Sequence, residues 1–352
     1  MVHHDGEVIV RAEGALRRVT LNRPKALNAL TLDMAEMMTR YLRPWATDPN
    51  AGAILLDGAG DRGFCAGGDI RALYDAAKSG SPLPEQFWAT EYHLNVLIAR
   101  YPKPVVAVMD GVVMGGGVGL SAYASHRVVT ERSAVAMPEV GIGFFPDVGA
   151  SFRLARAPGY AGTYLALTGE RMNAADAIYC GFADVQIAAG KLADLPLALA
   201  DCHSASDVRT RLAEMSAATG PGRLQAAQNW IDECFGADEV EAIVERLRAM
   251  NLDAARAALS AMEKASPTSL KVTLRNVRAA LSFTRMEQSF QQDYRIALAS
   301  IAGHDFIEGI RATIVDKDRN PKWQPAKLSD VTADIVERHF KSVGKLELSF
   351  PD

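Results

Sequence analysis

The sequence predicts an α/β protein with a mainly parallel β-sheet in its first part and a helical C-terminal part. Two observations support this fold class. Short apolar runs alternate with helical stretches over about the first 190 residues, as they do in βαβ units. From about Ala188 onward strand signals nearly vanish, and apolar residues recur at helical spacing instead. The boundary is therefore expected near residue 190.

The N-terminal elements follow from alternation and spacing. Val8 and Val10 alternate with polar neighbours, which predicts a strand, and a second strand is expected around Val19 and Leu21. A helix should follow, with Thr31 as its N-cap. Its apolar residues at helical spacing are Met34, Met38, Tyr41 and Trp45.

Three further apolar runs, at 53–56, 105–109 and 128–130, have the length and composition of buried strands. A helix around 86–99 separates the first two, and another is expected to open at the glycines 115–117. Strands joined by helices of this length form parallel crossovers. In the C-terminal part, helical spacing is found at 239–250, 253–263, 268–281, 286–299, 306–314 and 331–340.

Composition narrows the function classes. The 352 residues carry 42 acidic and 38 basic side chains, a net charge of −4, without the clustered basic excess that binding to nucleic acid or anionic membranes requires. No apolar stretch is long enough to span a bilayer, and the N-terminus lacks the basic and apolar regions of a signal peptide. We therefore expect a soluble cytoplasmic protein with neither nucleic acid nor membrane as partner.

The four cysteines are scattered along the chain, with no CxxC pair and no cluster with histidine. Structural zinc requires closely spaced thiolates, and a chain of this length has no need of disulfides. We expect no metal, and buried or half-buried thiols in a reducing compartment. The residues concerned are Cys65, Cys180, Cys202 and Cys234.

Glycines dominate two of three unusual segments, FCAGGDI at 64–70 and GVVMGGGVGLS at 111–121. Backbone N–H groups at Gly67–Gly68 and Gly115–Gly117 have no Cβ in the way, and those at a helix N-terminus lack intrahelical partners. Two such groups converging on one oxygen would form an oxyanion hole. The alternative is that these glycines only make tight turns or close packing. The GGG segment fits neither the dinucleotide pattern nor the P-loop pattern.

The third segment, MPEVGIGFFPDVG at 137–149, contains two carboxylates, Glu139 and Asp147, among apolar residues. Unlike environments would give the two acids different roles. Alternatively, they cap helices or pair with a cation such as Arg153. Asp147 precedes a predicted helix and is a good N-cap candidate.

Together, CAGGD, GGG and PE followed by a glycine-rich loop resemble the crotonase superfamily, also called the enoyl-CoA hydratase/isomerase family. The resemblance is strongest to its 3-hydroxyisobutyryl-CoA hydrolase branch. The segments that carry it are LNRPKALNALT at 21–31, TEYHLN at 90–95, GGGVGLS at 115–121, the third segment, and DKDRNPKWQP at 316–325. It covers nearly the whole chain.

The resemblance implies a crotonase-type ββα superhelix (ClpP/crotonase fold) with a helical C-terminal region. It assigns residues 1–190 to the core with the active site, and 191–352 to a region that covers the site and contributes to oligomer contacts. The ligand would be an acyl-coenzyme A thioester, its carbonyl oxygen bound by the amides of Gly68 and Gly116. No separate cofactor is implied, because coenzyme A is part of the substrate, and a homo-oligomer is expected. The positions matching coenzyme A contacts are Arg23, Lys25, Ala26, Ala66, Gly68, Asp69 and Ile70.

One departure from the hydratase pattern separates hydrolysis from hydration. Hydratases use two glutamates to activate water, and Gly119 stands at the first of these positions, whereas Glu139 matches the second. Asp147 stands where hydratases have glycine, and Glu91 matches a substrate-contacting position of the hydrolases, where it would bind the 3-hydroxyl. The resemblance thus implies thioester hydrolysis in valine catabolism, with Glu139 as base or nucleophile and Asp147 orienting water or substrate. A hydratase/isomerase and a catalytically silent coenzyme A-binding protein are the alternatives.

A serine or cysteine nucleophile is not expected. Ser121 has no GxSxG elbow around it, which argues against a triad with any of the histidines. Cys65 is interpreted as a small packed side chain. The histidines considered for a triad are His93, His126 and His304.

Overall fold

The computed structural model describes residues 2–351. Its contacts divide the chain into two compact units, each assembled from three separate segments. Unit 1 comprises Met1–Gly68, Thr90–Val135 and Met172–Arg223. Unit 2 comprises Asp69–Ala89, Ala136–Arg171 and Leu224–Asp352. Because the units are interleaved along the sequence, they do not follow the expected division at residue 190.

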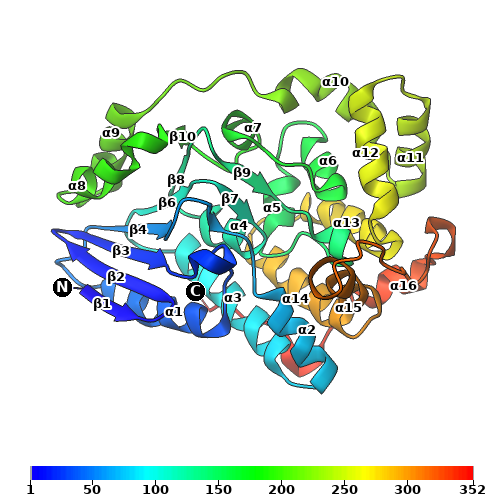
Figure 1. The fold of residues 1–352 in the computed structure, drawn as a ribbon, viewed down its shortest axis with the longest axis horizontal. Helices are drawn as coiled ribbons and strands as arrows, with labels where there is room; N and C mark the ends of the chain where they lie inside the picture. Colours follow the sequence, from blue (N-terminus) through cyan, green and yellow to red (C-terminus); the bar gives the residue numbers. More distant parts are fainter. Residues whose placement is uncertain (1, 352) are drawn as a thin grey trace. The chain divides into compact units, whose positions relative to one another are not determined.

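Unit 1 contains a seven-stranded sheet with the strand order β1-β2-β3-β4-β6-β8-β10. The first three strands pair antiparallel, and from β3 onward all pairs are parallel, as expected (Figure 1). The strands are β1 (Val2–Asp5), β2 (Val8–Glu13), β3 (Leu16–Leu21), β4 (Ala53–Gly58), β6 (Val105–Met109), β8 (His126–Val129) and β10 (Val185–Gln186).

The central strands are buried because their side chains are apolar on both faces. All five residues of β6 are buried, and β6 lies between β4 and β8 with Ile54 opposite Val105 and Val106 opposite His126. One face carries a core cluster to which the helices after β10 contribute Leu199 and Val208. Continuous apolar runs of this kind are typical of strands in parallel sheets.

A second, three-stranded sheet has the order β5-β7-β9, with strands β5 (Gly63–Cys65), β7 (Val112–Met114) and β9 (Ala134–Ala136). β5 and β7 are parallel neighbours, with Cys65 opposite Val113. Parallel strands end at the same edge of a sheet, so the two glycine segments that follow them meet there. This short sheet, absent from the sequence prediction, brings the glycines together.

The helices of unit 1 include α1, which begins as predicted: Thr31 Oγ1 accepts a hydrogen bond from the Met34 amide at 3.1 Å. The helix α3 (Leu83–Ala99) contributes its residues up to Ala89 to unit 2 and those from Thr90 onward to unit 1. The helix α1 comprises Leu32–Trp45. The remaining elements of unit 1 are η1 (Pro24–Ala26), α4 (Gly116–Ser121), α7 (Ala174–Tyr179), η3 (Ala189–Asp194), α8 (Leu195–Leu199) and α9 (Ala205–Met215).

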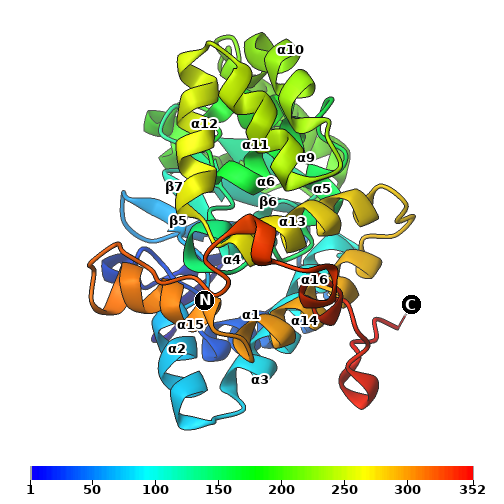
Figure 2. The same cartoon turned by 90° about the vertical axis from the view of Figure 1, so that its right-hand side faces the viewer.

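Unit 2 is helical, and its helix α13 (Pro267–Ala280) packs against α5, α6, α11, α14 and α16. Figure 2 shows α11 and α12 lying side by side. The other elements are α2 (Ile70–Ser79), η2 (Glu139–Ile142), α5 (Ala150–Leu154), α6 (Ala161–Thr168), α10 (Arg223–Phe235), α11 (Val240–Ala249), α12 (Asp253–Lys264), α14 (Glu287–Ile301), α15 (Asp305–Ile310), the π-helix η4 (Arg311–Val315), η5 (Leu328–Asp330), α16 (Ala333–Arg338) and η6 (Gly344–Leu346).

The predicted C-terminal helices are confirmed, with one difference. The helix expected over 306–314 is an α-helix only as far as Ile310 and continues as the π-helix η4. All four cysteines are buried free thiols, as expected. Within residues 2–351, no helix combines the length and the apolar character needed to cross a bilayer.

Candidate active site

The two glycine segments of unit 1 place backbone amides next to each other. A Cβ built on Gly116 would lie 3.4 Å from the Gly68 amide nitrogen and 3.5 Å from the carbonyl carbon of Gly67. Gly116 is the first residue of α4, where N–H groups have no intrahelical partner. The loop before Gly68 is held by the amide of Leu30, which donates to Gly67 O at 2.8 Å. The structure therefore brings the two glycine segments together, and the oxyanion hole formed by their amides stays a prediction.

Glu91 lies beside these glycines. It is 2% exposed on α3, and a Cβ on Gly116 would approach its Oε1 more closely than the 3.0 Å that real Cβ atoms respect. Cys65 is also buried here, and burial, with a contribution from Glu91, raises the pKa of its thiol to about 12. The thiol is therefore protonated at neutral pH, which agrees with a packed side chain and not with a nucleophile.

The predicted coenzyme A segment at 23–26 forms the turn η1, which is connected to the glycine loop by the Ala66 amide donating to Leu27 O at 3.0 Å. Arg23 pairs with Glu7 through Nε at 2.9 Å. Lys25 and Ala26 are exposed. The structure therefore joins the two predicted coenzyme A segments, 23–26 and Ala66–Gly68, in unit 1.

Asn28 organises this turn, and the sequence prediction missed it. It is fully buried; its Oδ1 accepts from the Arg23 amide, and its Nδ2 donates to the carbonyls of Ala59 and Gly63, both at 3.0 Å. Its φ of 55° lies in the left-handed region that asparagine tolerates better than most residues. An asparagine close after a proline turn was the available signal.

Asp69 and Ile70 belong to unit 2, at the start of α2. Asp69 is the N-cap, and its Oδ1 accepts a hydrogen bond from the Ala72 amide at 3.2 Å. Asp69 therefore fixes the start of the segment that follows the glycines. Its contact with coenzyme A stays a prediction.

The carboxylate segment of unit 2 begins with η2, whose first residue is Glu139. Glu139 is 7% exposed, and its Oε2 has no hydrogen-bond partner within residues 2–351. Burial raises its pKa well above the ordinary range, and the negative charge of Asp147 raises it further. Asp147 is itself 6% exposed. Two nearby acids, of which one is driven toward its neutral form, are suited to acid–base chemistry.

Asp147 does not cap the helix that follows it. The N-cap of α5 is Gly149, without any side-chain cap. The reason is the backbone: Val148 and Gly149 have φ values of 53° and 75°, so the chain makes a left-handed turn between Asp147 and the helix. The capping alternative was therefore wrong. A β-branched residue at positive φ is strained, at a cost of order 1–3 kcal/mol.

The C-terminal helices hold both ends of the segment 139–149. At one end, the amide of Ser266, the N-cap of α13, donates to Val140 O at 3.1 Å. At the other, Asp293 Oδ2 on α14 accepts from the Gly149 amide at 2.8 Å, and its Oδ1 accepts from Asn276 Nδ2 at 3.0 Å. These tethers were missed by the sequence prediction, although polar residues on otherwise apolar helix faces were a signal for them.

The middle of the segment is fixed by aromatic packing and close backbone contact. Phe144 stacks on Trp88 with ring centroids 5.5 Å apart and lies 4.9 Å from the ring of Phe306. Gly143 lies so close to the backbone of Asp305 that a Cβ there has no room. The Asp305 carboxylate in turn accepts from Ser266 Oγ at 2.6 Å and from the Gln324 amide at 2.8 Å.

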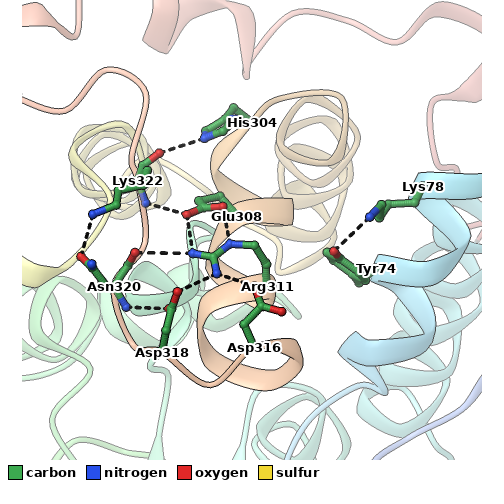
Figure 3. A network of polar contacts seen from close by, with 9 residues as sticks. All are labelled: Tyr74, Lys78, His304, Glu308, Arg311, Asp316, Asp318, Asn320 and Lys322. Carbon is green, nitrogen blue, oxygen red and sulfur yellow. Dashed lines mark hydrogen bonds and ion pairs between the residues drawn. The ribbon is translucent and has the colours of Figure 1, made fainter.

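The late segment 316–325 is a loop organised by one guanidinium group (Figure 3). Arg311 donates to both oxygens of Glu308 at 2.8 Å, and to Asp316 and Asp318 at 2.6 and 2.8 Å. The Lys322 amide donates to Glu308 Oε1 at 2.7 Å. These contacts explain the acidic and basic residues of the segment as a means of fixing its backbone.

Ser121 is an internal helix residue. Its hydroxyl is fully buried and donates to Gly117 O at 2.7 Å. His126 faces Ser125, with Nδ1 and Oγ 3.0 Å apart, and His304 Nε2 lies 2.9 Å from Lys322 O. Gly119 is buried within α4. These contacts give Ser121 a structural role.

The amino-acid sequence is similar to those of known proteins over nearly the whole chain. A sequence model described as enoyl-CoA hydratase/isomerase matches residues 16–340. Proteins named 3-hydroxyisobutyryl-CoA hydrolase, mitochondrial, from Rattus norvegicus and Homo sapiens are 42% and 40% identical over 351 residues, covering 98% of this chain and 91% of each relative.

Two solved structures are similar over nearly their whole length. One is a carnitinyl-CoA dehydratase from Mycobacterium thermoresistibile, with a TM-score of 0.93, 44% identity and coverage of 98% of this chain and 99% of the other. The second is an enoyl-CoA hydratase from Rhodobacter sphaeroides 2.4.1, with a TM-score of 0.92, 39% identity and coverage of 98% and 100%. The predicted fold class is confirmed by these similarities.

Proposed function

Because the chain belongs to the enoyl-CoA hydratase/isomerase family, we propose that it hydrolyses the thioester of 3-hydroxyisobutyryl-CoA, or of a similar short hydroxyacyl-CoA, to the free acid and coenzyme A. The relatives named for this hydrolase activity support the proposal over the full length of the chain. The observation that carries it is the acid pattern: Glu139 and Asp147 are both buried and interact, whereas Gly119 supplies no second glutamate for hydration.

The reaction begins with polarisation of the thioester carbonyl. The amides of Gly68 and Gly116 donate to its oxygen, on which negative charge develops as the tetrahedral intermediate forms. Loss of one donor of this kind reduces the rate by about 10²–10³-fold, or roughly 3–4 kcal/mol. Glu91 lies beside Gly116 and would bind the substrate hydroxyl. A site built for a hydroxyl strongly disfavours acyl chains without one.

Glu139 acts as base or as nucleophile. As base, it takes a proton from water while the water oxygen attacks the carbonyl carbon; collapse of the intermediate breaks the C–S bond, and the proton passes to the leaving thiolate. As nucleophile, its carboxylate attacks the carbonyl carbon, and collapse of the intermediate breaks the C–S bond and expels the coenzyme A thiolate, leaving a mixed anhydride. Water then hydrolyses the anhydride to the free acid and the Glu139 carboxylate, and the proton that water releases passes to the thiolate. Asp147 orients the water or the substrate in either route. In valine catabolism the free acid would be the product carried forward.

Thiol release from 3-hydroxyisobutyryl-CoA tests the proposal. Wild type should release thiol, and Glu139→Gln should lose most of the activity; near wild-type turnover in this variant would remove Glu139 from the reaction. Hydrolysis in ¹⁸O-water under single-turnover conditions separates the two routes, because only the nucleophilic route places solvent oxygen in the Glu139 carboxylate.

Hydration is the second candidate, favoured by the names of the two similar solved structures. It predicts loss of crotonyl-CoA absorbance in the presence of the protein. Gly119 argues against it, because water is then activated by one glutamate only. A catalytically silent protein would bind coenzyme A tightly without turnover of any acyl chain.

The coenzyme A moiety would lie along the segment 23–26, Ala66, Gly68, Asp69 and Ile70, with no separate cofactor and no metal. A homo-oligomer and a cytoplasmic location complete the proposal. The relatives carry the word mitochondrial in their names. Light scattering and cell fractionation test these two points; a monomer, or recovery with an organelle, would contradict them.

A further inference from the structure

Asp293 is a fully buried carboxylate to which the proposed reaction gives no role. It lies on α14 at 0% exposure, and within unit 2 the Gly149 amide and Asn276 Nδ2 donate to its two oxygens. A carboxylate is costly to bury, and burial together with the charge of Asp147 raises its pKa well above the ordinary range. An apolar residue would fill this helix position without the desolvation cost of a buried carboxylate. The groups that hydrogen-bond to Asp293 therefore indicate why an acid stands here.

What it holds is the turn that carries Asp147. Val148 and Gly149 both have positive φ, an arrangement that a β-branched residue adopts only where its surroundings enforce it. The Gly149 amide points at Asp293 Oδ2, so the hydrogen bond fixes the peptide immediately after the strained residue. Because Asp147 is one residue before that peptide, its carboxylate direction depends on the same contact.

Asp293 is itself held in place by a chain of side chains. Asn276 on α13 donates to Asp293 Oδ1, and Asn276 Oδ1 accepts from Gln292 Nε2 at 2.5 Å. In each of these hydrogen bonds, one residue is the donor and the other is the acceptor. The arrangement extends from the face of α13, through α14, to the turn at Gly149.

We infer that Asp293 is a positioning residue for the hydrolysis, which keeps the Asp147 carboxylate directed toward Glu139 by holding the Val148–Gly149 turn through the Gly149 amide. The inference rests on the proposed function. Misplacement of a reacting group by about 1 Å is enough to reduce a rate about 100-fold. The effect should therefore fall on kcat, because the coenzyme A segments do not involve this turn.

The hydrogen-bond pattern permits a reciprocal swap. In Asn276→Asp/Asp293→Asn, the new asparagine at 293 accepts from the Gly149 amide through Oδ1 and donates through Nδ2 to the new aspartate at 276. The second oxygen of that aspartate accepts from Gln292 Nε2. All three hydrogen bonds are retained, while the negative charge moves from α14 to α13.

The experiment compares Asp293→Ala, the swap and Ser300→Ala by thiol release from 3-hydroxyisobutyryl-CoA. Ser300 is the matched control, since it is buried on the same helix and its hydroxyl donates to Ile296 O at 2.7 Å, within that helix. Asp293→Ala should reduce kcat about 100-fold with KM within about threefold. The swap should recover kcat to within about tenfold of wild type, and Ser300→Ala should equal wild type. A folded Asp293→Ala with wild-type kcat overturns the inference.

Hydrogen exchange over residues 139–150 gives a readout that does not depend on turnover. Exchange of the Gly149 amide should be slow in wild type and in the swap, and fast in Asp293→Ala. If Asp293→Ala does not fold, the swap decides: a folded swap that is inactive despite a slow Gly149 amide overturns the inference, and an active one supports it. If wild type releases no thiol, the proposed function fails, whereas the exchange data still show whether Asp293 holds the turn.

Discussion

Gly116→Ala is the sharpest test of the amide pair, because the structure specifies what one methyl group would meet. Its Cβ would overlap Glu91 Oε1 and lie 3.4 Å from the Gly68 amide nitrogen. A carbonyl oxygen bound by that amide has to lie about 2.7–3.1 Å from the nitrogen, so the methyl group competes for the same space. The backbone itself accepts alanine, since Gly116 is helical and has no positive φ.

The expected loss in kcat/KM is about 10²–10³-fold, which corresponds to roughly 3–4 kcal/mol of lost transition-state stabilisation. Overpacking against Glu91 should cost about 1–3 kcal/mol of unfolding free energy, partly offset by the gain of about 0.5–1 kcal/mol from alanine in a helix. The variant should therefore fold. The assay is thiol release from 3-hydroxyisobutyryl-CoA, with the melting temperature measured in parallel.

Gly141→Ala is the matched control for this change. Gly141 lies in η2 beside Glu139, has no positive φ and has no atom within 4 Å of its added Cβ. Its activity should stay within about twofold of wild type. A folded Gly116→Ala enzyme with wild-type kcat/KM would refute the assignment of the Gly68 and Gly116 amides to the oxyanion hole.

Three further predictions follow from the charges. Glu139→Gln should raise the melting temperature at pH 7.5, because burial places the folded-state pKa of Glu139 above its unfolded value and ionisation therefore destabilises the fold. The gain in stability should shrink as the pH falls through that pKa, and each tenfold change in proton affinity corresponds to about 1.4 kcal/mol. An equal gain at both ends of the pH range would contradict this prediction. Asp147→Asn should shift the acid limb of the kcat/KM profile to lower pH, because burial still raises the pKa of Glu139 but the charge of Asp147 no longer does; an unmoved limb would assign it to another group. Cys65→Ala should retain kcat within about twofold of wild type. Burial raises the pKa of the Cys65 thiol to about 12, so the native thiol should resist iodoacetamide. Rapid alkylation with loss of activity would show that the thiol is reactive.

The sequence was most informative where structure is local. Strand β6 occupies the predicted residues 105–109, and Thr31 caps α1 as expected, because both follow from apolar runs and cap chemistry over a few neighbouring residues. The candidate site residues were identified from motifs, and the structure brings Gly68, Gly116 and Glu91 together in one unit.

What the sequence did not predict depends on long-range contacts or on backbone conformation. Strands β5 and β7 have three residues each, which is too few for a periodic signal in the sequence. They form because they pair with each other across about 50 residues of sequence. Asp147 has the residue type of an N-cap, but the positive φ values of Val148 and Gly149 place a left-handed turn between Asp147 and α5. The interleaving of the two units likewise has no local signature.

Gly149 and Asp293 are 144 positions apart in the sequence, and this separation has a consequence for biosynthesis. All of unit 1 lies before Leu224, so the residues of its sheet and its glycine amides are synthesised before those of α13 and α14. At about 5–20 residues per second, synthesis from residue 224 to residue 293 takes roughly 3–14 seconds. During that interval the nascent chain contains Gly149 but not Asp293, the acceptor of its amide hydrogen bond. The contact that holds the Val148–Gly149 turn can therefore form only after translation has passed residue 293.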